Sequence, residues 1–124
     1  SMVEKKSTIF CDIDGTIFKY RKFETYESSS PEVCPNVKEK LQQWKDEGHM
    51  ILLTTARPFD MYSHTEKELL VNDIPYDRLI MEIERGPRIL INDMDSNKPG
   101  QRAMGVNLIR NEGFEGIDWT DYGL

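Results

Sequence analysis

The stretch that decides the fold is Thr8-Ile9-Phe10-Cys11-Asp12-Ile13-Asp14-Gly15-Thr16. It starts as a short apolar run that is partly β-branched, and carboxylates and a glycine then replace the apolar side chains. This change is typical of a buried strand that ends in a polar loop. We therefore predict a strand over residues 8–11, followed by a loop in which Asp12 and Asp14 can face one crevice.

Further apolar runs predict more strands along the chain. Residues 50–53 and 89–91 are strongly apolar and lead into polar residues, while residues 78–81 and 106–109 are weaker candidates. Unbroken apolar runs indicate strands that are buried on both faces, as in a parallel sheet.

Two segments between these runs carry helical signals. Residues 63–72 predict one helix, and the other begins at Pro35 and ends before Gly48. In the helix that starts at Pro35, the apolar residues follow i, i+4, i+7 spacing: Val37, Leu41 and Trp44. Strands that alternate with helices predict an α/β fold, a Rossmann-like three-layer sandwich with a mostly parallel central sheet.

Length and composition bound the organisation of the chain. A chain of 124 residues predicts a single domain over residues 1–124. Residues 17–34 are aromatic, charged and rich in serine, and they predict a short flap-like excursion. Residues 111–124 form a tail that the sequence leaves unassigned.

Charge and hydropathy disfavour two classes of partner. The formal net charge of −6 is unsuited to a nucleic-acid backbone, which needs clustered basic residues. No apolar run approaches the ~20 residues of a spanning helix, so no membrane partner is expected. Two cysteines, Cys11 and Cys34, are too few for a disulfide framework, and we predict that both are reduced and that the protein is cytoplasmic.

The residues that follow the apolar runs predict a cation site. Two carboxylates held close together, as Asp12 and Asp14 would be, either share a proton or bind a cation. Mg²⁺ prefers oxygen ligands, keeps several waters and is often completed by substrate phosphate. Asp93, which follows the run 89–91, is the third predicted ligand. An Asp carboxylate can also attack phosphorus and form an aspartyl-phosphate.

Asp12-Ile13-Asp14-Gly15-Thr16 resembles the first motif of the haloacid dehalogenase-like superfamily, whose members are mostly Mg²⁺-dependent phosphatases. The resemblance implies that Asp12 is the nucleophile and Asp14 the general acid and base. It also implies that Asp12 binds Mg²⁺ through its carboxylate and Asp14 through its main-chain carbonyl.

Two later segments resemble further motifs of the superfamily. Leu53-Thr54-Thr55-Ala56-Arg57 resembles the second motif, in which a Thr or Ser hydrogen-bonds the phosphoryl group. We assign that role to Thr55, with Thr54 as the alternative, and we place Arg57 among the phosphate-binding residues. Asn92-Asp93 resembles the fourth motif, which supports Asp93 as a metal ligand.

The sequence departs from the third motif, which supplies a lysine close to the fourth strand. No lysine lies between Lys67 and Lys98. We assign its catalytic role to Arg85, with Arg88 as the second choice and phosphate-binding residue, and with Lys98 as a further alternative. Arg binds phosphate well but is not equivalent to Lys in reach or shape. This departure is expected to affect the turnover rate more than phosphate binding.

The spacing of the motifs leaves no room for an inserted cap domain, so the resemblance is to the small capless type. Its open site either accepts a large substrate or is closed by a second subunit of a homo-oligomer. We predict a Mg²⁺-dependent phosphatase that acts on a phosphomonoester, such as a sugar phosphate or another phosphorylated metabolite. The alternative is a phosphate-binding or scaffolding protein with little turnover. A receiver-like signalling domain is disfavoured, because the run 50–53 ends in threonine rather than in an acidic phospho-acceptor.

Overall fold

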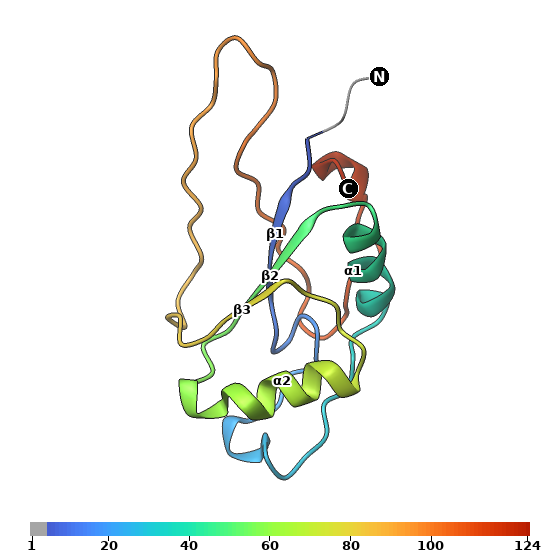
Figure 1. Cartoon of the computed structure of the whole chain (residues 1–124), viewed down its shortest axis with the longest axis vertical. Helices are drawn as coiled ribbons and strands as arrows, with labels where there is room; N and C mark the ends of the chain where they lie inside the picture. Colours follow the sequence, from blue (N-terminus) through green and yellow to red (C-terminus); the bar gives the residue numbers. More distant parts are fainter. Residues whose placement is uncertain (1–4) are drawn as a thin grey trace.

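The structure, a computed structural model, describes residues 5–124 and contains one parallel sheet of three strands (Figure 1). In order across the sheet, the strands are β1 (Thr8–Asp12), β2 (Met50–Thr54) and β3 (Arg78–Ile80). Asp12 pairs with Thr54, and Thr54 pairs with Ile80, so the three strands end level with one another. The predicted α/β class with a parallel sheet is confirmed.

Two helices flank the sheet. Helix α1 (Val37–Asp46) lies beside it, and helix α2 (Tyr62–Val71) lies beyond the carboxyl ends of the strands (Figure 1). Asn36 precedes α1 in the left-handed region, with φ of 61°. The predicted apolar face of α1 is confirmed, since these three residues are buried: Val37, Leu41 and Trp44.

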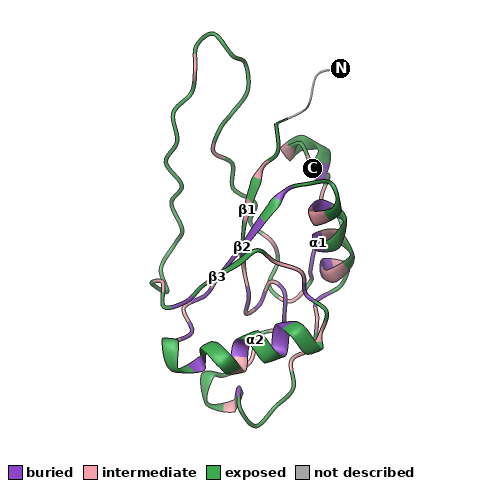
Figure 2. Ribbon diagram, in the orientation of Figure 1, coloured by how far each residue is buried: buried purple, intermediate pink, exposed green. Residues whose placement is uncertain are grey.

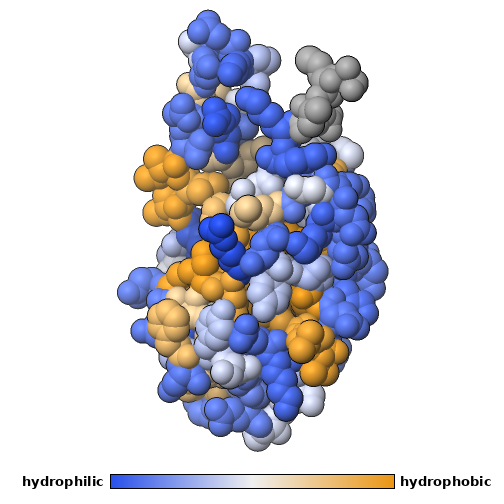
Figure 3. Space-filling view, viewed as in Figure 1, coloured by the Kyte–Doolittle hydropathy of each residue, from blue (hydrophilic) through white to orange (hydrophobic). Residues whose placement is uncertain are grey.

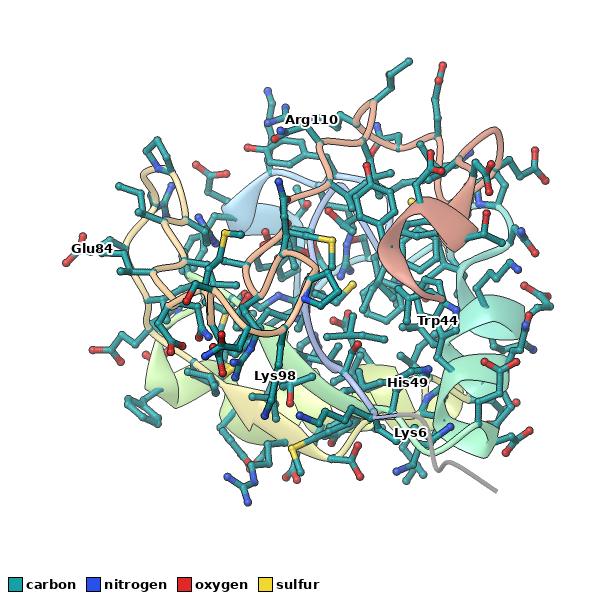
Figure 4. The ribbon with its side chains drawn as sticks, turned by 90° about the horizontal axis from the view of Figure 1, so that it is seen from above. Lys6, Trp44, His49, Glu84, Lys98 and Arg110 are labelled. Atoms are coloured by element: carbon teal, nitrogen blue, oxygen red, sulfur yellow. The ribbon has the colours of Figure 1, made fainter. Side chains whose placement is uncertain are left out.

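The C-terminal residues complete the core on the side of α1. The ring of Trp44 stacks on Phe114 with centroids 5.5 Å apart, and it meets Trp119 edge-on at 4.9 Å. Trp119 begins a short 3-10 helix, η3 (Trp119–Tyr122), which lies next to α1 in Figure 4. The tail that the sequence left unassigned therefore covers α1 with aromatic side chains.

The excursion 17–34 closes at its base as a small hairpin. The main-chain N–H of Lys19 donates to Glu32 O at 2.8 Å, and Cys34 N–H donates to Ile17 O at 2.8 Å. Both cysteines are free and buried, as predicted for reduced thiols. Burial, and then the charge of Asp12, raises the pKa of the Cys11 thiol to about 12.

The apolar runs 89–91 and 106–109 do not form strands in the structure, and this differs from the prediction. They belong to an extended excursion of residues 83–110 that reaches past the amino ends of the strands (Figure 1). Ile89 and Ile91 are 83% and 87% exposed, and apolar side chains gather on this excursion in Figure 3. Only residues 81–88 separate β3 from the run 89–91, which is short for a parallel crossover.

Neither interval between the three strands contains a second folded unit in residues 5–124, so no cap domain is inserted there. Residues 13–49 contain the hairpin excursion, the 3-10 helix η1 (Phe23–Thr25) and α1, while residues 55–77 contain the 3-10 helix η2 (Phe59–Met61) and α2. The buried residues of Figure 2 follow the sheet, the inner faces of both helices and the loop after β1. Within residues 5–124, no helix has the length and apolar character needed to cross a membrane.

Candidate active site

The loop after β1 alternates between buried and accessible residues. Ile13 and Ile17 are fully buried, and Ile13 O accepts hydrogen bonds from the N–H groups of residues 16–18. Gly15 has φ of 90°, a conformation that side chains with a Cβ rarely adopt, and its N–H donates to Phe18 O at 2.7 Å. Because the isoleucines anchor the loop, Asp12 and Asp14 are held at the carboxyl edge of the sheet.

Asp12 presents an accessible carboxylate at this edge. Its side chain is 39% exposed, Thr16 Oγ1 donates to Oδ2 at 3.3 Å, and Arg88 Nη2 lies 3.4 Å from Oδ1. Desolvation raises the pKa of the Asp12 carboxyl above its ordinary value, although Arg88 and Thr16 offset part of the increase. A carboxyl whose pKa is shifted by desolvation beside a charged partner is a candidate functional group.

Asp14 makes a bidentate hydrogen-bonded ion pair with Arg57. Arg57 Nε donates to Asp14 Oδ2 at 2.9 Å, and Arg57 Nη2 donates to Oδ1 at 2.8 Å. Burial lowers the pKa of Arg57, but the hydrogen bonds and charges of Asp14 and Glu68 outweigh burial and raise it. Bidentate pairs of this kind fix the orientation of a carboxylate as well as its charge.

The guanidinium of Arg57 is committed to protein acceptors. The residue is 3% exposed, and Nη1 donates to Glu68 Oε1 at 2.7 Å and to Thr65 Oγ1 at 3.0 Å. Phosphate binding by Arg57 stays a prediction, and it would require some of these contacts to open.

The two threonines after the apolar run of β2 differ in accessibility. Thr55 is buried, and its Oγ1 accepts the N–H of Arg57 at 3.1 Å, while Thr54 is partly exposed. Thr55 Oγ1 is thus engaged with the main chain, and Thr54 is the more accessible of the two. The phosphoryl contact predicted for Thr55, with Thr54 as the alternative, stays a prediction.

The structure distinguishes among the candidate basic residues. Arg88 reaches Asp12, whereas in residues 5–124 no ion pair or side-chain hydrogen bond joins Arg85 or Lys98 to either aspartate of the first motif. Glu84, next to Arg85 in sequence, points away from the protein body in Figure 4. Arg88, our second choice from the sequence, is therefore the basic residue that lies beside the predicted nucleophile, Asp12.

Asp93 does not join the other predicted metal ligands in the structure. Its side chain is 79% exposed, and Arg102 Nη1 lies 4.0 Å from its Oδ1. The described part of the chain contains no group of three His, Cys, Asp or Glu residues that could hold a metal ion. Asp93 stays a predicted ligand that would need the excursion 83–110 to move.

The predicted ligands suit a metal ion that is bound partly by the substrate. Mg²⁺ in proteins is commonly bound by one or two carboxylates, several waters and substrate phosphate. Asp12 supplies an accessible carboxylate, and the main-chain carbonyl of Asp14 is the other predicted donor. The residues present therefore fit a Mg²⁺ ion that is bound together with a phosphate, rather than one enclosed by protein ligands.

Sequence reasoning missed two residues of the charged network around Asp14. They are Arg21, which lies in the excursion 17–34, and Glu68, which lies on α2. The available signal was weak: a glutamate one position before the apolar pair Leu69-Leu70, where helical spacing brings it close to the buried face. Contacts between charged residues that are far apart in the sequence leave no pattern from which they can be predicted.

The comparisons with known proteins place the chain in a family. The model of the family described as haloacid dehalogenase-like hydrolase matches residues 9–89, which is more than half of the chain. No curated protein matches the chain. No solved structure matches it either. The matched residues include the first motif, β2, α2 and Arg88, and the resemblance found in the sequence is confirmed. The chain belongs to the haloacid dehalogenase-like hydrolases and is a hydrolase of that type.

Proposed function

We propose that the protein is a Mg²⁺-dependent phosphatase that hydrolyses a phosphomonoester through an aspartyl-phosphate on Asp12. The observation that carries the proposal is the contrast between the two aspartates of the first motif. Asp12 is open and faces Arg88, while Asp14 is largely buried and oriented by Arg57. An exposed nucleophile beside an oriented proton carrier is what a two-step phosphoryl transfer needs.

The proposed reaction has two balanced steps. An Oδ atom of Asp12 attacks phosphorus in line, so a bond to Asp12 forms while the ester P–O bond breaks, and the leaving oxygen takes a proton from Asp14. Water then attacks the phosphorus of the aspartyl-phosphate and gives a proton to Asp14, and the bond to Asp12 breaks. Arg88 and the hydroxyl groups of Thr54 and Thr55 are the proposed contacts of the phosphoryl oxygens.

The proposed substrate is a phosphorylated small molecule, such as a sugar phosphate. The family supports a hydrolase, and the net charge of −6 is a reason to prefer a small substrate to a nucleic acid. We also propose that residues 1–124 act as one catalytic domain, that a second copy of the chain closes the open site, and that the protein works in the cytoplasm. The two free cysteines support the last point.

Removal of divalent ions is the direct test of the proposed cofactor, and members of this superfamily generally use Mg²⁺. The ion would be held by Asp12, the main-chain carbonyl of Asp14 and, after movement of the excursion 83–110, Asp93. When bound, it neutralises negative charge on the nucleophile and the phosphate. We expect EDTA to reduce hydrolysis of p-nitrophenyl phosphate by about a hundredfold or more, and added Mg²⁺ to restore it. Full activity in EDTA would exclude this cofactor.

The basic residue beside Asp12 can be identified by comparing two arginine variants. Because Arg88 is 3.4 Å from Asp12, we expect Arg88→Ala to lower kcat/KM for p-nitrophenyl phosphate by about tenfold, a typical loss for one charge-assisted contact. Arg85→Ala is expected to have the smaller effect, since Arg85 does not contact either aspartate. The opposite order would assign the role to Arg85, our first choice from sequence.

A phosphate-binding protein with little turnover is the second candidate. The observation that favours it is the absence of a lysine between Lys67 and Lys98, where the third motif would supply one. Binding of inorganic phosphate without Mg²⁺-dependent hydrolysis of p-nitrophenyl phosphate would support this candidate over a phosphatase.

A further inference from the structure

A chain of alternating charges leads from Asp14 into the protein interior. Arg57 connects the Asp14 carboxylate to Glu68, whose Oε1 accepts Arg57 Nη1 at 2.7 Å. Glu68 also accepts two bonds from Arg21 Nη2, at 3.1 Å to Oε1 and 2.9 Å to Oε2. The side chains of Arg21 and Glu68 are 10% and 6% exposed, so these contacts are largely shielded from water and salt.

Tyr26 packs the same charges from the side of the excursion 17–34. Both guanidinium groups lie over its ring, Arg57 at 4.4 Å and Arg21 at 5.0 Å from the centroid. Desolvation, and then the charge of Asp14, raises the pKa of the Tyr26 phenol to about 12. His64 Nε2 lies 3.3 Å from Glu68 Oε2 and 3.1 Å from Tyr26 O. The excursion and helix α2 therefore meet at Glu68.

We propose that Glu68 is a positioning residue for Asp14, which it orients through Arg57 while Arg21 fixes Glu68 from the excursion. This inference rests on the proposed function, because it concerns the group that carries the proton in that reaction. Glu68 does not contact the reacting atoms, and its effect passes through the guanidinium that it shares with Asp14.

Two features of the geometry support this role. First, Glu68 lies on a helix, and a site supported by regular structure is more precise than one supported by loops alone. Second, Arg57 donates to Asp14 through Nε and Nη2 and to Glu68 through Nη1, so the position of Glu68 fixes the guanidinium that orients Asp14.

If the ion pair between Arg57 and Glu68 were purely structural, its loss would have a different consequence from the loss of a positioning residue. Loss of a structural pair lowers stability or the amount of active enzyme, and it lowers the rates for all substrates by one factor. Loss of a correctly placed proton donor acts selectively, because esters with poor leaving groups depend on protonation more than esters with good ones. Phenyl phosphate and p-nitrophenyl phosphate differ in this property while sharing an aromatic ring.

The test is Glu68→Gln, with Glu66→Gln as the matched control on the same helix. Glu66 is exposed, so its substitution makes the same chemical change away from Asp14. With Mg²⁺ present, we expect Glu68→Gln to lower kcat/KM, which reports the step that expels the leaving group, about tenfold more for phenyl phosphate than for p-nitrophenyl phosphate. We expect Glu66→Gln to leave both rates unchanged. Equal losses on both substrates, or no loss, would overturn the proposal.

A second variant covers the case in which Glu68→Gln does not fold, since that change leaves two buried arginines short of a partner. Arg21→Lys keeps the positive charge but replaces the guanidinium that donates to both oxygens of Glu68. We expect the same selective loss on phenyl phosphate, with smaller amplitude, and an equal effect on both substrates would again overturn the proposal. Failure of the proposed function is separate, because the unmodified protein would then hydrolyse neither ester.

Discussion

Replacing Asp12 by Asn is expected to lower kcat for p-nitrophenyl phosphate by on the order of a thousandfold or more. The amide has nearly the same shape as the carboxylate, but its oxygen is a much weaker nucleophile toward phosphorus. Because the contacts with Thr16 and Arg88 are peripheral to the core, the sheet should form as before. Initial rates with saturating Mg²⁺, measured beside the unmodified protein, provide the comparison.

Stability gives this variant an independent check. The folded state raises the pKa of Asp12, chiefly by desolvation, so folding favours the neutral form of this side chain. The contribution of Asp12 to the stability of the folded protein falls as pH rises from the ordinary carboxyl pKa to the raised one. Above that window, the charged Asp12 makes the folded protein less stable than a neutral side chain would. We therefore expect the neutral Asn to keep or raise the melting temperature at pH 7.

The matched control for Asp12→Asn is Asp73→Asn. Asp73 is exposed and has φ of 55°, a conformation that Asn tolerates well, and it lies on the loop after α2. We expect it to retain full activity. Activity in the Asp12 variant equal to that of the control would remove Asp12 as the nucleophile.

Leu41→Ala is expected to lower the free energy of unfolding by about 2–5 kcal/mol, the range for a buried leucine whose cavity cannot fully collapse. Leu41 is fully buried on the face of α1 that packs against the sheet. Leu70→Ala makes the same chemical change on α2, where the side chain is 76% exposed, and it should stay within about 0.5 kcal/mol of the unmodified protein.

Urea unfolding followed by circular dichroism measures both leucine variants under one condition. The slope of the transition should be similar in the two, because both variants expose nearly the same surface on unfolding. Equal losses for Leu41 and Leu70 would contradict the placement of α1 over the sheet.

The sequence was most informative where one residue type replaces another abruptly. The change from Phe10-Cys11 to Asp12 marked the end of β1, and the spacing of Val37, Leu41 and Trp44 gave the buried face of α1. Both features are local, because the pattern of buried positions in a strand or a helix repeats every few residues. They sufficed to predict the class of fold and the edge where the candidate site lies.

The surroundings of Asp14 could not be obtained in the same way. Arg57 and Arg21 meet Glu68 across 11 and 47 positions of sequence, and no periodic pattern connects charged residues so far apart. The prediction of strands within the excursion 83–110 was wrong for another reason. Its apolar run 89–91 has the composition of a buried strand, but whether it pairs depends on the connection to β3, which composition does not describe.

The most direct measurement is acid-quench mass spectrometry of the protein during turnover of p-nitrophenyl phosphate with Mg²⁺. The Asp14→Asn variant is the best sample, because it lacks the carboxylate that takes the proton from water in the second step, so a phosphorylated form should accumulate. We expect one phosphoryl group on the peptide that contains Asp12, and none when Asp12 is also replaced by Asn. Release of phosphate by the unmodified protein, with no phosphoryl group on Asp12 at any quench time, would contradict the account.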